Sequence, residues 1–294
     1  RVSATLDFGN ANLPFHVQTS FDQSPLAPFF ALIPQLSGIS IVGVATGQVE
    51  FGGNIAHRDA NGNLVYSAAG LTGSARFSQL NLRLEDTPIN AVEPVAIRFD
   101  TREVVIESAR FAGGGSNLTV AGTKALAESG VNNLSIDGRI NLSLLNVFPQ
   151  IASGDTFFGG FADVSIRLAG ANSAARLSGA GTLDNASFST FAGSDRLLFV
   201  RLQGIIRFAS NQVQVDRVSG FLGGGEFVAS GGAVLGSDLR PDSFRFDLTG
   251  NNITVPLPED FITTGDAKLE ISGRRFAGGG LSTLIAGRIL AKRS

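Results

Sequence analysis

Apolar and polar residues alternate along most of the chain, and this period of two is the pattern of β-strands. Apolar side chains at every second position share one face of a strand, and the positions between them are mostly polar, as Arg98 and Arg207 are. Such alternation is typical of antiparallel sheets with one dry face and one wet face. The positions that we predict to line one apolar face are Val49, Phe51, Leu80, Leu82, Ile97, Phe99, Val104, Ile106, Ile166, Leu168, Ile206, Phe208, Val213, Val215, Phe244, Phe246, Leu248, Leu269 and Ile271.

The pattern leaves little room for helix. Turns or short helices are expected only at Pro28–Leu36, Leu142–Ile151 and Pro258–Ile262, and a buried strand is expected at Ile39–Val44. Residues 23–49 carry no charge, but Pro34 and Gly38 would break a membrane-spanning helix there. Turns between strands are predicted at the pairs Asn61-Gly62, Asp137-Gly138, Gly250-Asn251 and Gly265-Asp266.

The chain also repeats itself. Ile97-Arg98-Phe99 and Ile206-Arg207-Phe208 open similar segments, and we call the spacing from Ile97 to Ile206 the repeat offset. Residues 71–82 also resemble residues 177–188, and one extra residue near Gly220 would align the triple-glycine runs 113–115 and 223–225. A period of roughly a hundred residues indicates one supersecondary unit used more than once. We therefore predict one continuous repeat region over residues 1–294, with modules at 1–147 and 148–255 and the start of a third at 256–294.

The glycine runs 113–115, 223–225 and 278–280 raise the question of a phosphate-binding loop. Such a loop has the form GxxxxGK[ST], and no Lys follows these runs at the required place. Each run instead follows a Phe by one residue within the strand pattern. We interpret the runs as tight turns, bulges or points of close backbone approach.

Composition narrows the possible functions. Hydrophobic residues make up 43% of the chain and charged residues 16%, below the roughly 25% usual for a soluble domain. Phe accounts for 23 aromatic residues and Tyr for one, so the aromatic surface has almost no polar groups. The net charge of −2 gives no basic patch for nucleic acid, and the lack of Cys excludes disulfides, thiolate metal sites and cysteine nucleophiles.

Residues that could carry catalysis are few. The two histidines, His16 and His57, stand in polar surroundings outside any metal-binding motif, and we expect both to be surface or structural residues. Asp163 and Asp266 recur at similar places in the repeat, and we interpret them as caps of turns. We therefore predict no catalytic residue, no metal site and no cofactor.

The segments FRFDLTGNNITVPLPEDFITTGDAKLEISG (244–273) and STLIAGRILAKRS (282–294), together with the IxF strands and GGG turns, carry a family resemblance. They resemble the C-terminal repeat region of TamB-like proteins, within the AsmA-like group of bacterial envelope proteins. The resemblance implies an all-β fold, in which an elongated repeat sheet curls into an open apolar trough, the β-taco, with one-to-two-turn helices between modules.

The same resemblance implies a function in lipid transport and outer-membrane biogenesis. Such proteins are anchored in the inner membrane, cross the periplasm of Gram-negative-type bacteria, carry phospholipid to the outer membrane and assist outer-membrane protein assembly with a β-barrel partner of the BamA/TamA type. Because the chain begins at Arg1 and contains no Met, we expect it to be a periplasmic section or processed form of such a protein.

Two other classes of function fit the same pattern. One is a structural stalk or interaction scaffold, a β-solenoid or β-sandwich in which all apolar faces form closed core. The other is an enzyme on a β-helix, such as a polysaccharide lyase. A β-helix repeats at a much shorter period than the one seen here, which disfavours the enzyme. We expect a non-enzymatic conduit that binds phospholipid or another acyl-chain lipid, with the stalk as the alternative.

Overall fold

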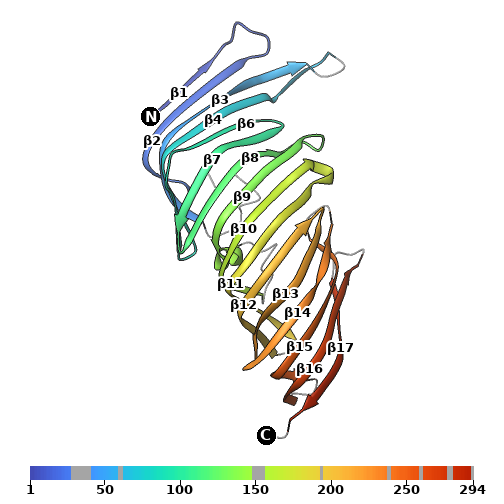
Figure 1. The fold of residues 1–294 in the computed structure, drawn as a ribbon. Coiled ribbons are helices and arrows are strands. Elements are labelled where there is room, and N and C mark those ends of the chain that lie inside the picture. Colours follow the sequence, from blue (N-terminus) through green and yellow to red (C-terminus); the bar gives the residue numbers. More distant parts are fainter. Residues whose placement is uncertain are drawn as a thin grey trace. The chain divides into compact units, whose positions relative to one another are not determined.

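The protein is all-β in the computed structural model, which describes residues 1–27, 41–58, 62–147, 156–192, 195–236, 240–257, 261–276 and 281–292 (Figure 1). The strands belong to one 17-stranded antiparallel sheet, so the predicted fold class is confirmed. Two short 3-10 helices, η2 (Leu142–Val147) and η3 (Asn172–Ala174), lie between strands in the described ranges.

The strands are β1 (Val2–Leu6), β2 (Pro14–Pro25), β3 (Ile41–Arg58), β4 (Leu64–Leu84), β5 (Thr87–Ala91), β6 (Val95–Asp100), β7 (Glu103–Gly113), β8 (Ser116–Ala125), β9 (Val131–Asn141), β10 (Phe157–Ala171), β11 (Arg176–Ala192), β12 (Asp195–Ala209), β13 (Gln212–Leu222), β14 (Gly225–Leu235), β15 (Pro241–Leu257), β16 (Phe261–Arg275) and β17 (Leu281–Ala291).

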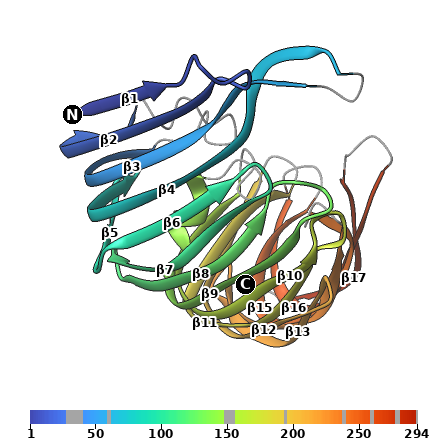
Figure 2. The ribbon, with the colours of Figure 1, turned by 90° about the horizontal axis from the view of Figure 1, so that it is seen from above.

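The chain divides into two units, which we describe separately. Unit 1 comprises residues 1–136 and 169–175, and unit 2 comprises residues 137–168 and 176–294. In unit 1, β2 pairs with β3, β3 with β4 and β4 with β6, and β6 to β8 continue as hairpins. In unit 2, β11 to β17 pair in chain order. The strands of unit 2 curve around an interior in Figure 2.

Each unit has its own apolar core on one face of its part of the sheet. In unit 1 the core is centred on Ala45, Leu80, Val95 and Ala109, none of which is more than 9% exposed. In unit 2 the larger core includes Ile253, which is completely buried, and η2 contributes Leu142 to its margin. Every second residue of a strand therefore packs inward, as the alternation in the sequence predicts.

The internal repeat is visible in the strand register. Ile97 pairs with Ile106, and one repeat offset later Ile206 pairs with Val215. Each residue pair of the hairpin β7–β8 recurs one repeat offset later in the hairpin β13–β14. The bulge recurs as well, after Ile106 in the first hairpin and after Val215 in the second. The partner strand recurs as well, because Ala75 pairs with Ile97 just as Gly181 pairs with Ile206.

The inserted residue that we predicted near Gly220 does not exist. Gly113 pairs with Ser116, and Leu222 pairs with Gly225, again one repeat offset later. The two-residue turns are therefore Gly114-Gly115 and Gly223-Gly224, all with positive φ between +55° and +89°. The two triple-glycine runs are therefore displaced by one position relative to the repeat offset. The strand register is the same in both hairpins, and it determines which two glycines of each run form the turn. Both runs are turns, as predicted, whereas the run 278–280 lies outside the described residues.

Three of the four predicted turn pairs lie inside strands, so these predictions were wrong. Asp137-Gly138 lies in β9, Gly250-Asn251 in β15 and Gly265-Asp266 in β16, whereas Gly62 does lie between β3 and β4. The pair in β15 adjoins a register shift between Gly250 and Ile253, where Asn252 has a φ of +54°. A bulge uses the same residue types as a turn without ending the strand, which explains this error.

The short helical segments are only partly testable. The prediction for Pro28–Leu36 lies outside the described residues, and so do residues 148–151 of the predicted segment Leu142–Ile151, whose first part is η2. Of the segment Pro258–Ile262, Phe261 and Ile262 begin β16, which corrects that prediction. The strand predicted at Ile39–Val44 is described from Ile41, where β3 begins.

No helix in the described ranges has both the length and the apolar character needed to span a membrane.

Candidate functional site

The candidate site is the inner face, by which we mean the face of each unit that carries its buried and half-buried apolar side chains. Antiparallel pairing places directly opposite residues on the same face, so the pairs can be followed from strand to strand as rows. In unit 2, the Phe208 row comprises Phe208, Val213, Ala233, Phe244 and Gly273. The Ile206 row comprises Ile206, Val215, Gly231, Phe246 and Ile271.

Two deeper rows complete the inner face of unit 2. The Leu248 row comprises Gly204, Val218, Ala229, Leu248 and Leu269. The Phe227 row comprises Gly220, Phe227, Gly250 and Ala267. All nine residues predicted for the site between positions 206 and 271 therefore lie in three adjacent rows of one face.

Burial increases along the strands from the Phe208 row to the Phe227 row. Every residue of the Phe208 row is half-buried, and so are all members of the Ile206 row except Val215. Leu248 is 3% exposed, and Phe227 and Ala267 are each 4% exposed. The inner face of unit 2 therefore has a closed end and an open end, and large apolar side chains meet solvent at the open end.

Glycine makes room for large side chains on this face. A Cβ on Gly220 would lie 2.7 Å from Cδ2 of Leu202. A Cβ on Gly231 would lie 2.8 Å from Cδ1 of Phe246 and closer still to the backbone oxygen of Arg245. Rows that alternate large and very small residues pack closely although the sheet curves. These glycines are part of the packing surface rather than breaks in the strands.

Unit 1 has the same arrangement. The Phe51 row comprises Phe51, Gly73, Phe99, Val104 and Lys124. The Val49 row comprises Val49, Ala75, Ile97, Ile106 and Gly122. The predicted residues Leu80 and Leu82 also lie on the inner face of this unit, where they pair with Ala45 and Gly43.

The two remaining predicted residues lie on β10. The Cα of Ile166 would be 2.9 Å from a Cβ on Gly179, and Gly179 pairs with Phe208, so Ile166 lies next to the open row of unit 2. Leu168 is half-buried. Each predicted residue is thus buried or half-buried within its own unit.

A series of aromatic side chains on the inner face was missed by the sequence reasoning. The ring centroids of Phe158 and Phe188 are 5.5 Å apart, those of Phe188 and Phe199 are 5.9 Å apart, and those of Phe199 and Phe227 are 5.4 Å apart. Leu202 pairs with Ala186, and a bulge lies on each side of this pair. The bulges change which residues of β12 face inward, so counting every second residue from Phe208 assigns Phe199 to the wrong face. Phe content alone is the sequence signal that could have found these residues.

The opposite face carries ion pairs at equivalent places in the repeat. Arg98 pairs with Glu107 at 3.2 Å, and one repeat offset later Arg207 forms an ion pair with Asp216. A hollow of about 930 Å³ is lined by Arg207, Arg245 and Arg274. Its lining also includes Val213 and Phe244 of the Phe208 row, so polar and apolar residues both contribute to it.

The two acidic residues that we predicted to cap turns, Asp163 and Asp266, lie within strands and form ion pairs there. Asp163 lies within β10 and pairs with Arg139 at 3.2 Å. Asp266 lies within β16, where it accepts the backbone N–H of Asn252 at the β15 bulge and pairs with Lys292 at 2.7 Å. These contacts lower the pKa of Asp266. The prediction that both residues cap turns was therefore wrong.

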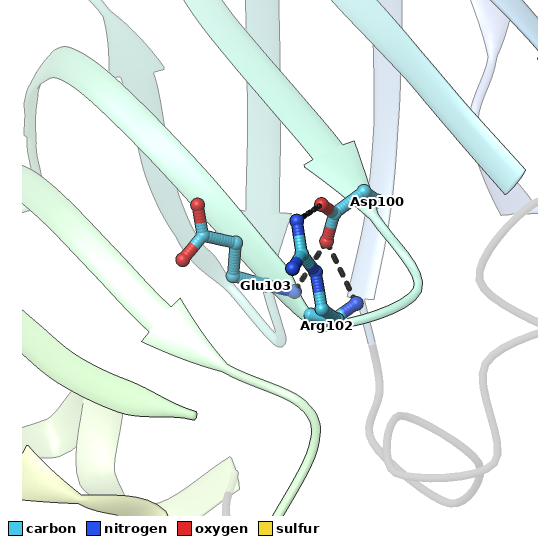
Figure 3. A network of polar contacts seen from close by, with 3 residues as sticks. All are labelled: Asp100, Arg102 and Glu103. Carbon is cyan, nitrogen blue, oxygen red and sulfur yellow. Dashed lines mark hydrogen bonds and ion pairs between the residues drawn. The ribbon is translucent and has the colours of Figure 1, made fainter. Parts of the chain in front are cut away.

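A carboxylate that does bind the backbone of a turn is that of Asp100, the last residue of β6 (Figure 3). Its Oδ1 accepts the backbone N–H of Arg102 at 2.7 Å and that of Glu103 at 2.8 Å, and its Oδ2 lies 3.4 Å from the Arg102 guanidinium. The backbone hydrogen bonds are the main cause of the lowered pKa of Asp100.

His16 is exposed on β2, and the side chain of His57 lies outside the described residues. Within the ranges that the structure describes, no group of three His, Cys, Asp or Glu residues could hold a metal ion.

Comparison of the chain with known protein families, with characterised proteins and with solved structures gives no match. Chemically, the inner face offers mostly apolar surface, which in unit 2 is half open to solvent at one end of the strands.

Proposed function

We propose that the inner faces bind the acyl chains of lipids and that the protein is a non-enzymatic conduit for phospholipid transfer. The resemblance to TamB-like proteins supports a place in the periplasm, between an inner-membrane anchor and an outer-membrane β-barrel partner of the BamA/TamA type. It also supports a role in outer-membrane protein assembly. Phospholipid or another acyl-chain lipid is the proposed ligand.

The observation that carries this proposal is the open end of the inner face of unit 2. Phe208, Val213 and Phe244 are half-buried in the Phe208 row, although a closed core would cover all three. Covering an acyl chain contributes about 0.8 kcal/mol per CH₂ group. A continuous half-exposed apolar row can therefore bind a lipid tail while the lipid head group remains in water.

One observation favours the alternative of a structural stalk. Leu222, Phe227 and Leu248 are at most 4% exposed, so the closed end of the same face is ordinary core. In a stalk, the open end would be the margin of this core and would bind nothing. The two proposals therefore differ in what occupies the Phe208 row.

Photo-crosslinking distinguishes these two functions. A photoreactive residue at Phe208 should capture phospholipid from detergent micelles, and the same residue at Arg207 should not, because neighbouring positions face opposite sides of the strand. A third position, Phe227, should capture little, because its surroundings are closed. Equal capture at Phe208 and Arg207, or no capture at Phe208, would refute the conduit and favour the stalk.

A further inference from the structure

Lys124 places a cation on the apolar inner face of unit 1. Its position is directly opposite Val104, which in turn pairs with Phe99, so Lys124 is a member of the half-buried Phe51 row. The constant repeat offset makes Ala233 the equivalent position in unit 2, where it lies opposite Val213 and Phe244. The two units therefore share this row, but only unit 1 has a charged residue at this position.

The charge of Lys124 is not neutralised by a carboxylate. The ammonium donates to the backbone oxygen of Ala125 at 2.8 Å and to Oδ1 of Asn172 at 2.7 Å, and both acceptors are uncharged. No ion pair involves Lys124 in the part of the chain that the structure describes. Partial burial lowers the pKa of Lys124. A partly desolvated ammonium that has only neutral acceptors attracts an anion.

A buried amide holds this cation in place. Asn132 is 1% exposed, and its Oδ1 accepts the backbone N–H of Ala125 at 3.1 Å. Its Nδ2 donates to the backbone oxygen of Gly170 at 3.3 Å and to Oδ1 of Asn172 at 3.4 Å. Asn172 is thereby fixed from one side while it accepts from Lys124 on the other. The ammonium is preorganised, and two hydrogen bonds leave one of its three N–H donors for a ligand.

The length of the row suits a lipid tail next to this cation. From Lys124 to Phe51 the row crosses four strand-to-strand spacings, about 19 Å at roughly 4.8 Å each, and it continues beyond Phe51 to Val17. A bilayer core of about 30 Å contains two opposed acyl chains, so one chain spans about 15 Å. One acyl chain along the Phe51 row would therefore bring its head group close to Lys124.

We propose that Lys124 binds the anionic head group of a lipid whose acyl chain lies along the Phe51 row, which makes unit 1 selective for anionic lipids. Unit 2, with Ala233 at the equivalent position, binds acyl chains without this selectivity. This inference rests on the proposed function and adds to it a lipid class and a residue that sets the preference.

The test compares phosphatidylglycerol with phosphatidylcholine of the same acyl chains, captured by photoreactive residues at Phe99 in unit 1 and Phe208 in unit 2 of the full chain. Phe99 should capture the anionic lipid roughly tenfold better, because the choline cation of phosphatidylcholine cancels the charge of its phosphate, whereas phosphatidylglycerol keeps a net negative charge for Lys124. Phe208 should capture both lipids alike. Inorganic phosphate at the same concentration should not displace the lipid, and displacement would refute the assignment to a lipid.

Exchanging the equivalent residues gives the decisive controls. Lys124→Ala should abolish the preference at Phe99 without loss of phosphatidylcholine capture, and Lys124→Arg should retain it. Ala233→Lys should create a preference at Phe208, and this variant tests the charge even if Lys124→Ala impairs folding. Equal capture of the two lipids at Phe99 in the unmodified protein would refute the inference alone. Failure to capture any lipid at either position would refute the proposed function as well.

Discussion

Phe99 lies directly opposite Gly73, and its ring covers the space that a side chain of Gly73 would need. A Cβ on Gly73 would be 2.5 Å from Cζ of Phe99, 2.6 Å from the backbone oxygen of Glu50 and 2.8 Å from Cβ of Phe51. In unit 2, Phe208 likewise pairs with a glycine, Gly179, but a Cβ there would meet the β10 backbone at Ser165 and Ile166. The pairing of a large side chain with a glycine is thus repeated, whereas the atoms that exclude a side chain differ between the two units.

Gly73→Ala should therefore destabilise the protein by about 1–3 kcal/mol, the usual cost of overpacking. Gly181→Ala is the matched control, because Gly181 is also an inner-face strand glycine, and its nearest neighbour would be Cγ1 of Val164 at 3.5 Å, an ordinary contact. Urea unfolding measures both variants. An equal loss of stability for the two variants would contradict the role of the Phe99 ring.

The two ends of the inner face of unit 2 should respond differently to a buried charge. Phe227→Asp should unfold the protein, because Phe227 is 4% exposed and an unpaired carboxylate there costs several kcal/mol. Phe208→Asp should retain the circular dichroism spectrum of the native protein and lose lipid binding, because Phe208 is half-buried at the open end.

Gln214→Asp on the exposed face serves as the control for the added charge and should change neither property. If Phe208→Asp unfolds the protein as completely as Phe227→Asp does, the Phe208 row is closed core and the stalk is favoured.

The turn carboxylate Asp100 should contribute stability that depends on pH. Its pKa in the folded protein is below the ordinary value of 3.8, so its stabilisation is fully present above that value and is lost as the pH falls through the lower, folded pKa. Asp100→Ala should lower the melting temperature at neutral pH, and the difference from the unmodified protein should shrink in acid. Melting curves over this pH range provide the test. A difference that stays constant in acid would exclude titration of Asp100 as the cause.

The repeated ion pairs on the outer face should contribute little. The side chains of Arg98 and Glu107 are 65% and 55% exposed, and those of Arg207 and Asp216 are 48% and 45% exposed. Exposed pairs of this kind are worth at most about 1 kcal/mol and are screened by salt. Double-mutant cycles with Arg98→Gln and Glu107→Gln, and with Arg207→Gln and Asp216→Asn, should give similar small values. A coupling energy well above that limit in either unit would contradict this assessment.

Local pattern was enough to predict much of this protein. The alternation around Ile97, Phe99, Ile206 and Phe208 placed these side chains on one face, because successive side chains of any strand point to opposite sides. The repeat offset identified strands that do have the same pairing register. The glycine runs could be assigned to turns because no lysine or helix start accompanies them.

Other features required strand pairing. Asp266 is separated from Asn252 by a stretch of β15 and β16, and only the pairing of these strands brings its carboxylate to the backbone N–H at the bulge. A bulge also reverses the alternation, so no count along one strand could place Phe199 beside Phe227. Pairing register is a non-local property, set by contacts between residues on different strands.

The sequence by itself determined that this is a repeated all-β chain with one apolar face, because alternation and repetition are local properties of the order of residues. Only the tertiary structure decided that this face is closed at Phe227 and open at Phe208, because burial depends on which strands cover a side chain. It also decided that Lys124, inconspicuous in the sequence, lies in an apolar row opposite Val104 and shares the hydrogen-bond acceptor Asn172 with the buried Asn132. Strand pairing brings these residues together, and no spacing along the chain encodes that contact.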